Sequence, residues 1–124
     1  MSDNKYPKEM ELTIKDFKKG KDSYFVKKNK GKKGLIVFYA GFCGYCNMLV
    51  PEWEAFYDKH KGKYFIGAVN TQNEKGGNHV ISGQMGVSGI PDIRYIDEEG
   101  KVSAEKFQGE RNIKNFVRYL ENKK

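Results

Sequence analysis

The stretch between residues 34 and 69 restricts the fold most, because it contains an apolar strand, an amphipathic helix and a second apolar strand in succession. Residues 35–39 are β-branched, aliphatic and aromatic and lie between glycines, which is typical of a strand buried on both faces. The following apolar residues recur at helical spacing through residue 60. Residues 64–69 form the second apolar run. This unit predicts a right-handed crossover between parallel strands, and therefore an α/β fold.

The C-terminal half supplies further elements. A polar loop at residues 70–78 precedes a short helical stretch near residues 79–85. Residues 93–96 and 102–107 predict an antiparallel hairpin around an acidic, glycine-ended turn. Apolar residues from position 113 to 120 predict a last helix with Asn112 as its N-cap.

The N-terminal region is less regular. Residues 9–14 predict a short β-type segment. Residues 16–29 mix aromatic residues with lysines and are compatible with a helix interrupted by Gly20. These patterns therefore predict one short extended segment and one broken helix before the first buried strand.

Length and composition favour a single domain over residues 1–124. A chain of 124 residues that is 38% hydrophobic is near the usual size of one domain and can bury a core. No apolar run approaches the roughly 18 residues of a membrane span, and residues 1–10 lack the apolar part of a secretory signal. We therefore expect a cytoplasmic protein with no membrane partner. If the chain comes from a large DNA virus, the virion becomes a second location.

The net charge of +7 is concentrated in the first third of the chain, where residues 1–42 carry 11 Lys against 5 acidic residues. Such a lysine cluster could bind nucleic acid or an acidic partner. A solvated surface is the favoured interpretation, because the chain has only 3 Arg and no interleaved aromatic stacking motif. The lysine cluster consists of Lys18, Lys19, Lys21, Lys27, Lys28, Lys30, Lys32 and Lys33.

The two cysteines of the chain, Cys43 and Cys46, form a Cys-Gly-Tyr-Cys motif where the buried strand turns into the helix. Free N–H groups and the helix dipole stabilise an anion at a helix start, so the pKa of the Cys43 thiol should fall below about 8.5. Cys43 is thus the expected nucleophile. Cys46, one turn further on, can displace a substrate from a mixed disulfide on Cys43.

Two other uses of this motif are weaker. A zinc site needs about four ligands, whereas the chain has no second cysteine pair, and His60 and His79 are too far apart in sequence for a zinc finger. A structural disulfide that closes so short a loop removes little entropy from the unfolded state. Redox chemistry without a metal or other bound cofactor is therefore the preferred interpretation.

Four segments around the cysteines occur in a distinctive order: Phe38-Tyr39-Ala40, Cys43-Gly44-Tyr45-Cys46, Pro51-Glu52-Trp53 and Gly89-Ile90-Pro91. In this respect the chain resembles the thioredoxin family, specifically the protein disulfide isomerase type of thioredoxin domain, over about residues 9–122. The resemblance implies a thioredoxin fold with a mixed central β-sheet and helices on both faces.

The resemblance also implies roles for individual residues. Pro91 would be a cis-proline facing the disulfide, and the backbone of Ile90 would pair with an extended substrate in the manner of strand addition. Arg111 would lower the pKa of the buried cysteine, although a surface charge before the last helix is an equally good interpretation. The active-site loop would further include Phe42, Gly44 and Tyr45.

Several residues depart from the family pattern. Val37 and Ala68 occupy the positions where the family carries a buried carboxylic acid and its lysine partner, so the proton relay for the inner cysteine is missing there. Asp92 follows the proline where threonine is common, and its carboxylate would oppose thiolate formation if it faced the thiols. Phe42 replaces a tryptophan and Tyr45 replaces the histidine of typical isomerases.

The sequence therefore predicts a thiol–disulfide oxidoreductase that reduces or isomerises protein disulfides through Cys43 and Cys46. The alternative is a thioredoxin-fold structural or binding module that uses the lysine cluster to bind nucleic acid or acidic partners. Neither the direction of electron flow, nor the reductase or oxidant partner, nor the oligomeric state follows from the sequence.

Overall fold

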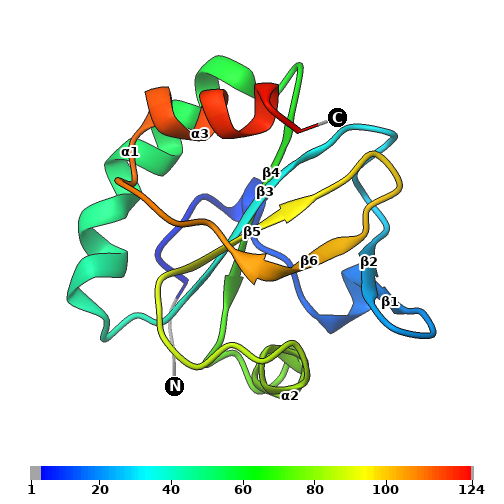
Figure 1. Ribbon diagram of the computed structural model, residues 1–124. Helices are drawn as coiled ribbons and strands as arrows, with labels where there is room; N and C mark the ends of the chain where they lie inside the picture. The colour runs from blue at the N-terminus through cyan, green and yellow to red at the C-terminus, as the bar shows by residue number, and fades with distance from the viewer. Residues whose placement is uncertain (1–3, 124) are drawn as a thin grey trace.

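A four-stranded mixed sheet with the strand order β4-β3-β5-β6 lies at the centre of the molecule (Figure 1). The structure is a computed structural model, and it describes residues 4–123. Its strands are β3 (Gly34–Tyr39), β4 (Phe65–Asn70), β5 (Asp92–Ile96) and β6 (Val102–Lys106). β3 pairs in parallel with β4 and antiparallel with β5. α1 (Gly44–His60) connects β3 to β4, so the predicted strand–helix–strand unit is confirmed.

β3 is an interior strand, since it lies between β4 and β5, and every one of its six residues is buried. Its first residue has to be glycine, since a Cβ atom on Gly34 would lie 1.7 Å from the carbonyl oxygen of Phe65. The strand then delivers the chain to the start of α1 at one end of the sheet. The position of the cysteine motif therefore depends on a strand that is held on both edges and both faces.

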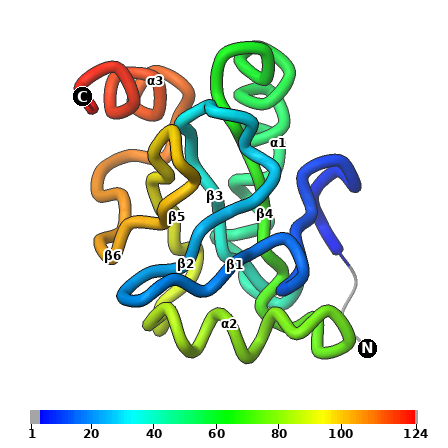
Figure 2. Tube along the Cα trace, turned by 90° about the vertical axis from the view of Figure 1, so that its right-hand side faces the viewer, coloured from blue at the N-terminus to red at the C-terminus, as the bar shows by residue number. Residues whose placement is uncertain are grey.

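Helices cover both faces of the sheet, as expected (Figures 1 and 2). α1 and α3 (Ile113–Glu121) pack on one face, where Trp53 and Phe116 are fully buried and their rings lie 5.0 Å apart. α2 (Asn78–Gln84) covers the other face through Ile81, which packs with Phe38. We call these the α1 face and the α2 face. Among the described residues, no helix is long and apolar enough to cross a membrane.

The C-terminal predictions are confirmed. β5 and β6 form an antiparallel hairpin whose turn is closed by the Gly100 N–H, which donates to the Asp97 carbonyl at 2.9 Å. Asn112 caps α3, since its side-chain oxygen accepts a hydrogen bond from the Asn115 N–H at 2.9 Å. The short helix predicted near residues 79–85 is α2.

The N-terminal predictions are wrong. Residues 16–29 form an antiparallel ribbon of β1 (Phe17–Lys19) and β2 (Tyr24–Val26) instead of a broken helix. The ribbon is favoured because it buries Phe17 and Val26 in the α2-face core. The extended segment expected at residues 9–14 is reduced to an isolated pairing of Glu11 with Ala68, between the 3-10 turns η1 (Lys8–Met10) and η2 (Ile14–Asp16).

Candidate active site

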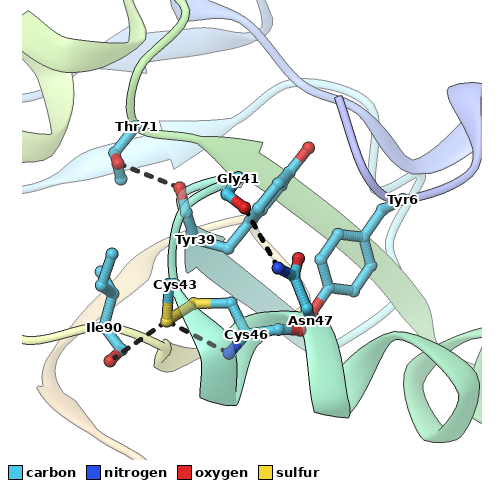
Figure 3. Close-up of a disulfide and its surroundings, with 8 residues drawn as sticks. All are labelled: Tyr6, Tyr39, Gly41, Cys43, Cys46, Asn47, Thr71 and Ile90. Carbon is cyan, nitrogen blue, oxygen red and sulfur yellow. Dashed lines mark hydrogen bonds between the residues drawn. A yellow bond between two sulfur atoms is a disulfide. The ribbon is translucent and has the colours of Figure 1, made fainter. Parts of the chain in front are cut away.

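Cys43 and Cys46 form a disulfide at the N-terminal end of α1 (Figure 3). Cys43 is the N-cap residue, and its Sγ accepts a hydrogen bond from the Cys46 N–H at 3.1 Å. Cys43 is partly exposed, whereas Cys46 is completely buried. Because of this difference in exposure, a protein substrate can reach Cys43. Cys46 can attack only the sulfur of Cys43, from the interior of the domain.

The loop that precedes β5 lies against the exposed cysteine. The peptide bond between Ile90 and Pro91 is cis. The Ile90 carbonyl oxygen lies 3.8 Å from the Cys43 Sγ, and a dashed line marks this contact in Figure 3. The structure thus brings together two segments that are 47 residues apart in the sequence. A peptide attached to Cys43 would contact the backbone of Ile90.

Large apolar side chains are exposed next to Cys43 in the sequence and further along α1. Phe42 is 77% exposed, Tyr45 is 68% exposed and Met48 is 75% exposed. Gly44, the first residue of α1, leaves this surface open, because a Cβ atom there would meet nothing within 4 Å. Phe42, Gly44 and Tyr45 were predicted members of the site. Met48, which no sequence pattern indicates, is exposed on α1 two residues after Cys46.

The positions expected to hold a proton relay carry only apolar side chains. Val37 and Ala68 are partners in the β3–β4 register, and both are completely buried. They belong to the same α1-face cluster as Cys46. No proton acceptor is available to Cys46 from these two positions.

A buried carboxyl group on this side of the sheet comes instead from Glu11, which no pattern in the sequence indicates. Its isolated pairing with Ala68 places it at the outer edge of β4. Its Oε2 accepts a hydrogen bond from the Tyr39 hydroxyl, and its Oε1 is buried without a hydrogen-bond partner among the described residues. Burial raises the pKa of Glu11 from 4.5 to about 7, against the opposing effect of the Tyr39 hydroxyl.

Tyr6 connects the N-terminal segment to the cysteine motif. Its hydroxyl donates a hydrogen bond to the Cys46 carbonyl oxygen at 3.0 Å, and its ring lies 4.5 Å from that of Tyr39 (Figure 3). Burial, together with the charge of Glu11, raises the pKa of Tyr6, while the charge of Arg111 lowers it. Arg111 is exposed and lies just before α3 in the chain. Its positive charge thus acts on Tyr6 from outside the core. A direct effect of Arg111 on Cys46 stays a prediction.

Asp92 does not face the thiols, contrary to what its position suggested. It lies opposite Phe38 in the β3–β5 register and therefore points to the α2 face, away from Cys46. There it forms a buried ion pair with Arg94, with Nε to Oδ1 at 2.7 Å and Nη2 to Oδ2 at 3.0 Å. The Arg94 side chain also donates to the Met85 and Ser103 carbonyl oxygens. The carboxylate is neutralised within the core.

The lysine cluster lies in and around the β1–β2 ribbon. Lys28 forms an ion pair with Asp16 at 3.0 Å, and Lys33 donates to the Lys123 carbonyl oxygen at 2.8 Å. Lys18 and Lys19 are exposed on β1. Within residues 4–123, no group of three or more His, Cys, Asp or Glu side chains is arranged to hold a metal ion.

The geometry agrees with comparisons to known proteins. The thioredoxin family model matches residues 13–122, so the chain belongs to the thioredoxin family. Within that family it is a domain of the protein disulfide isomerase type. It is 38% identical to human protein disulfide-isomerase A6 over 83 residues, which cover 67% of this chain and 18% of that protein. It is 26% identical to protein disulfide-isomerase 1 of Dictyostelium discoideum over 92 residues, or 74% of this chain and 25% of the relative.

Solved structures agree on the fold. The J-Trx1 fragment of ERdj5 is 26% identical and superposes with a TM-score of 0.60 over 75% of this chain and 43% of the fragment. Human ERp44, at 21% identity, superposes with a TM-score of 0.62 over 75% of this chain and 28% of that structure. The chain spans about a quarter or less of the two disulfide isomerases to which it is compared.

Proposed function

We propose that this domain is a thiol–disulfide oxidoreductase that acts on protein dithiols and disulfides. The observation that carries the proposal is the arrangement of the cysteines: Cys43 is partly exposed at the start of α1 and Cys46 is buried one turn behind it. The family to which the domain belongs, and the names of its disulfide isomerase relatives, support the same activity.

In the reducing direction the reaction starts from the dithiol. The Cys43 thiolate attacks one sulfur of a substrate disulfide, the substrate S–S bond breaks, and the leaving thiolate takes up a proton. The Cys46 thiolate then attacks the Cys43 Sγ, which releases the second substrate thiol and forms the Cys43–Cys46 disulfide seen in the structure. The substrate gains two electrons and the protein loses two. An external dithiol must reduce the protein again before another turnover.

The surface around Cys43 suits an unfolded or extended polypeptide. The exposed side chains of Phe42 and Tyr45, which flank Cys43, offer apolar contacts that do not depend on one particular substrate sequence. The backbone at Ile90 offers hydrogen-bonding groups next to the reacting sulfur. We propose that a dithiol reductase resets the domain when it reduces substrates, or that a disulfide oxidant does so when it oxidises them, and that a reducing compartment such as the cytoplasm is its place of action.

Cysteine variants test the proposal. Cys46→Ser should still attack a substrate disulfide through the Cys43 thiolate but should not resolve the mixed disulfide, so adducts with the disulfide-bonded chains of insulin should persist on non-reducing electrophoresis. Cys43→Ser should abolish turnover of insulin disulfides and should trap nothing. Equal behaviour of the two variants, or reduction of insulin by Cys43→Ser at the rate of the unchanged protein, would contradict the proposed division of roles.

A further inference from the structure

A hollow of about 520 Å³ opens beside the cysteine motif and is not used by the reaction described above. Phe42, directly before Cys43, and Ile90, whose carbonyl lies 3.8 Å from the Cys43 Sγ, both line it. The hollow therefore begins where a substrate chain attached to Cys43 would lie. Its other walls come from the loop after β4, from α2 and from the loop before β5.

The lining changes in character around the hollow. Phe42, Val87 and Ile90 supply apolar surface, whereas the loop after β4 and the first turn of α2 supply polar groups, including Glu74 and His79. Among the described residues that line it, Glu74 is the only carboxylate, and neither lysine nor arginine is present. The lining is therefore less basic than the chain as a whole, which has 20 Lys and a net charge of +7, and the nearest lysine ammonium shown at its border is Lys106 Nζ, 3.7 Å from the position of a Cβ atom on Gly89.

The loop that carries Glu74 is held in place by its own hydrogen bonds. The Gly77 N–H donates to the Glu74 carbonyl at 3.0 Å, and the Gly76 N–H donates to the Asn73 side-chain oxygen at 3.0 Å. Glu74 takes part in neither of the two ion pairs found among residues 4–123, which join Lys28 to Asp16 and Arg94 to Asp92. Its carboxylate is thus available on a loop of defined shape.

We propose that this hollow is a subsite for a lysine or arginine side chain next to the reactive cysteine of the substrate. The inference rests on the proposed oxidoreductase function and adds a substrate preference to it. A long basic side chain has an apolar stem and a charged head. The stem would lie along Phe42 and Ile90, and the head would reach Glu74. An acidic side chain would place its charge against that carboxylate.

The test uses short peptides whose single cysteine forms a mixed disulfide with thionitrobenzoate. The residue on one side or the other of the cysteine is lysine, glutamate or norleucine, which keeps the lysine stem without its charge. The coloured thiol leaves more readily because its pKa is lower, so Cys43 attacks the peptide sulfur. Second-order rate constants with the reduced protein are divided by those of the same peptide with dithiothreitol, which removes intrinsic differences between peptides.

In one of the two positions, lysine should react about threefold faster than glutamate at low salt, the size expected of an exposed ion pair, and this preference should weaken at high salt. Glu74→Gln should bring the lysine to norleucine ratio close to one. Glu99→Gln is the matched control, because it removes the same charge from the exposed turn at the far end of β5 and should leave the ratio unchanged.

The outcomes separate the two proposals. If the norleucine peptides react in a Cys43-dependent way but lysine gives no advantage at either position, the subsite is wrong and the oxidoreductase function stands. The same conclusion follows if Glu74→Gln and Glu99→Gln lower the lysine preference equally, because the preference would then arise from net charge. If none of the peptides reacts, the oxidoreductase function fails and the subsite fails with it.

Discussion

Replacement of Glu11 by glutamine should change how the stability of this domain depends on pH. In the folded protein burial raises the pKa of Glu11 to about 7, compared with an ordinary value of 4.5. The protonated form is therefore favoured by folding. Its contribution to stability is fully present below pH 4.5, is lost as the pH rises from 4.5 to 7, and stays lost above pH 7. At about 1.4 kcal/mol per pKa unit, the loss amounts to about 3 kcal/mol.

Urea unfolding of the disulfide form between pH 4 and pH 8 measures this effect without interference from free thiols. Glutamine keeps an oxygen that accepts from the Tyr39 hydroxyl and does not titrate. The free energy of unfolding of Glu11→Gln minus that of the unchanged protein should therefore rise by about 3 kcal/mol from pH 4 to pH 8. Other titrating groups contribute equally to both proteins, so the subtraction removes them.

Glu9→Gln is the control, because Glu9 is an exposed acid two residues away on η1. Its stability difference from the unchanged protein should not show this rise. The reasoning would be refuted if the Glu11→Gln difference stayed constant across the range, or if it fell as the pH rose. A constant difference would mean that the Glu11 carboxyl ionises equally readily in the folded protein and in the unfolded chain, and a falling difference would mean that it ionises more readily in the folded protein.

Three further changes test other parts of the structure. Arg94→Met leaves the Asp92 carboxylate buried and unpaired, so the free energy of unfolding in urea should fall by about 3–5 kcal/mol. Adding Asp92→Asn should recover part of this loss. A loss below about 1 kcal/mol in the single variant would contradict a buried ion pair. Val37→Glu buries a carboxyl group on the α1 face with Cys46, so it should cost several kcal/mol in stability yet speed release of the mixed disulfide near pH 7, measured by stopped flow with a fluorescent peptide. Unchanged or slower release in a folded variant would show that Cys46 needs no added base. Asn112→Ala removes the cap of α3 and should cost about 1 kcal/mol in urea unfolding, and an unchanged midpoint would argue against the cap.

Much of the fold could be predicted from short-range patterns. The apolar run of β3 and the helical spacing of α1 lie within one continuous stretch, and a parallel crossover is the arrangement that this order of elements allows. The cysteine motif, its place at a helix start and the hairpin near the C-terminus are equally local. Local hydrogen bonding and side-chain periodicity determine these features, so they can be predicted from residues that are close together in the sequence.

The β1–β2 ribbon shows where local patterns fail. Residues 17–26 have aromatic and lysine residues compatible with either conformation, and their strand form is selected by burial of Phe17 and Val26 under the sheet. Asp92 could have been assigned better, because Arg94 is two residues away on the same strand and therefore on the same face. The face itself, however, depends on the pairing of β5 with β3.

The Glu11 carboxyl and the hollow near Glu74 were decided by tertiary structure. Glu11 meets Tyr39 across 28 residues, Tyr6 meets Cys46 across 40, and the hollow joins segments from residue 42 to residue 90. No periodicity in the sequence encodes these contacts, because they depend on which segments pair and in what register after the sheet has formed. The sequence alone therefore determined the redox pair and the framework that presents it. Packing determined the surroundings of that pair, since burial and electrostatic fields arise only when distant segments meet.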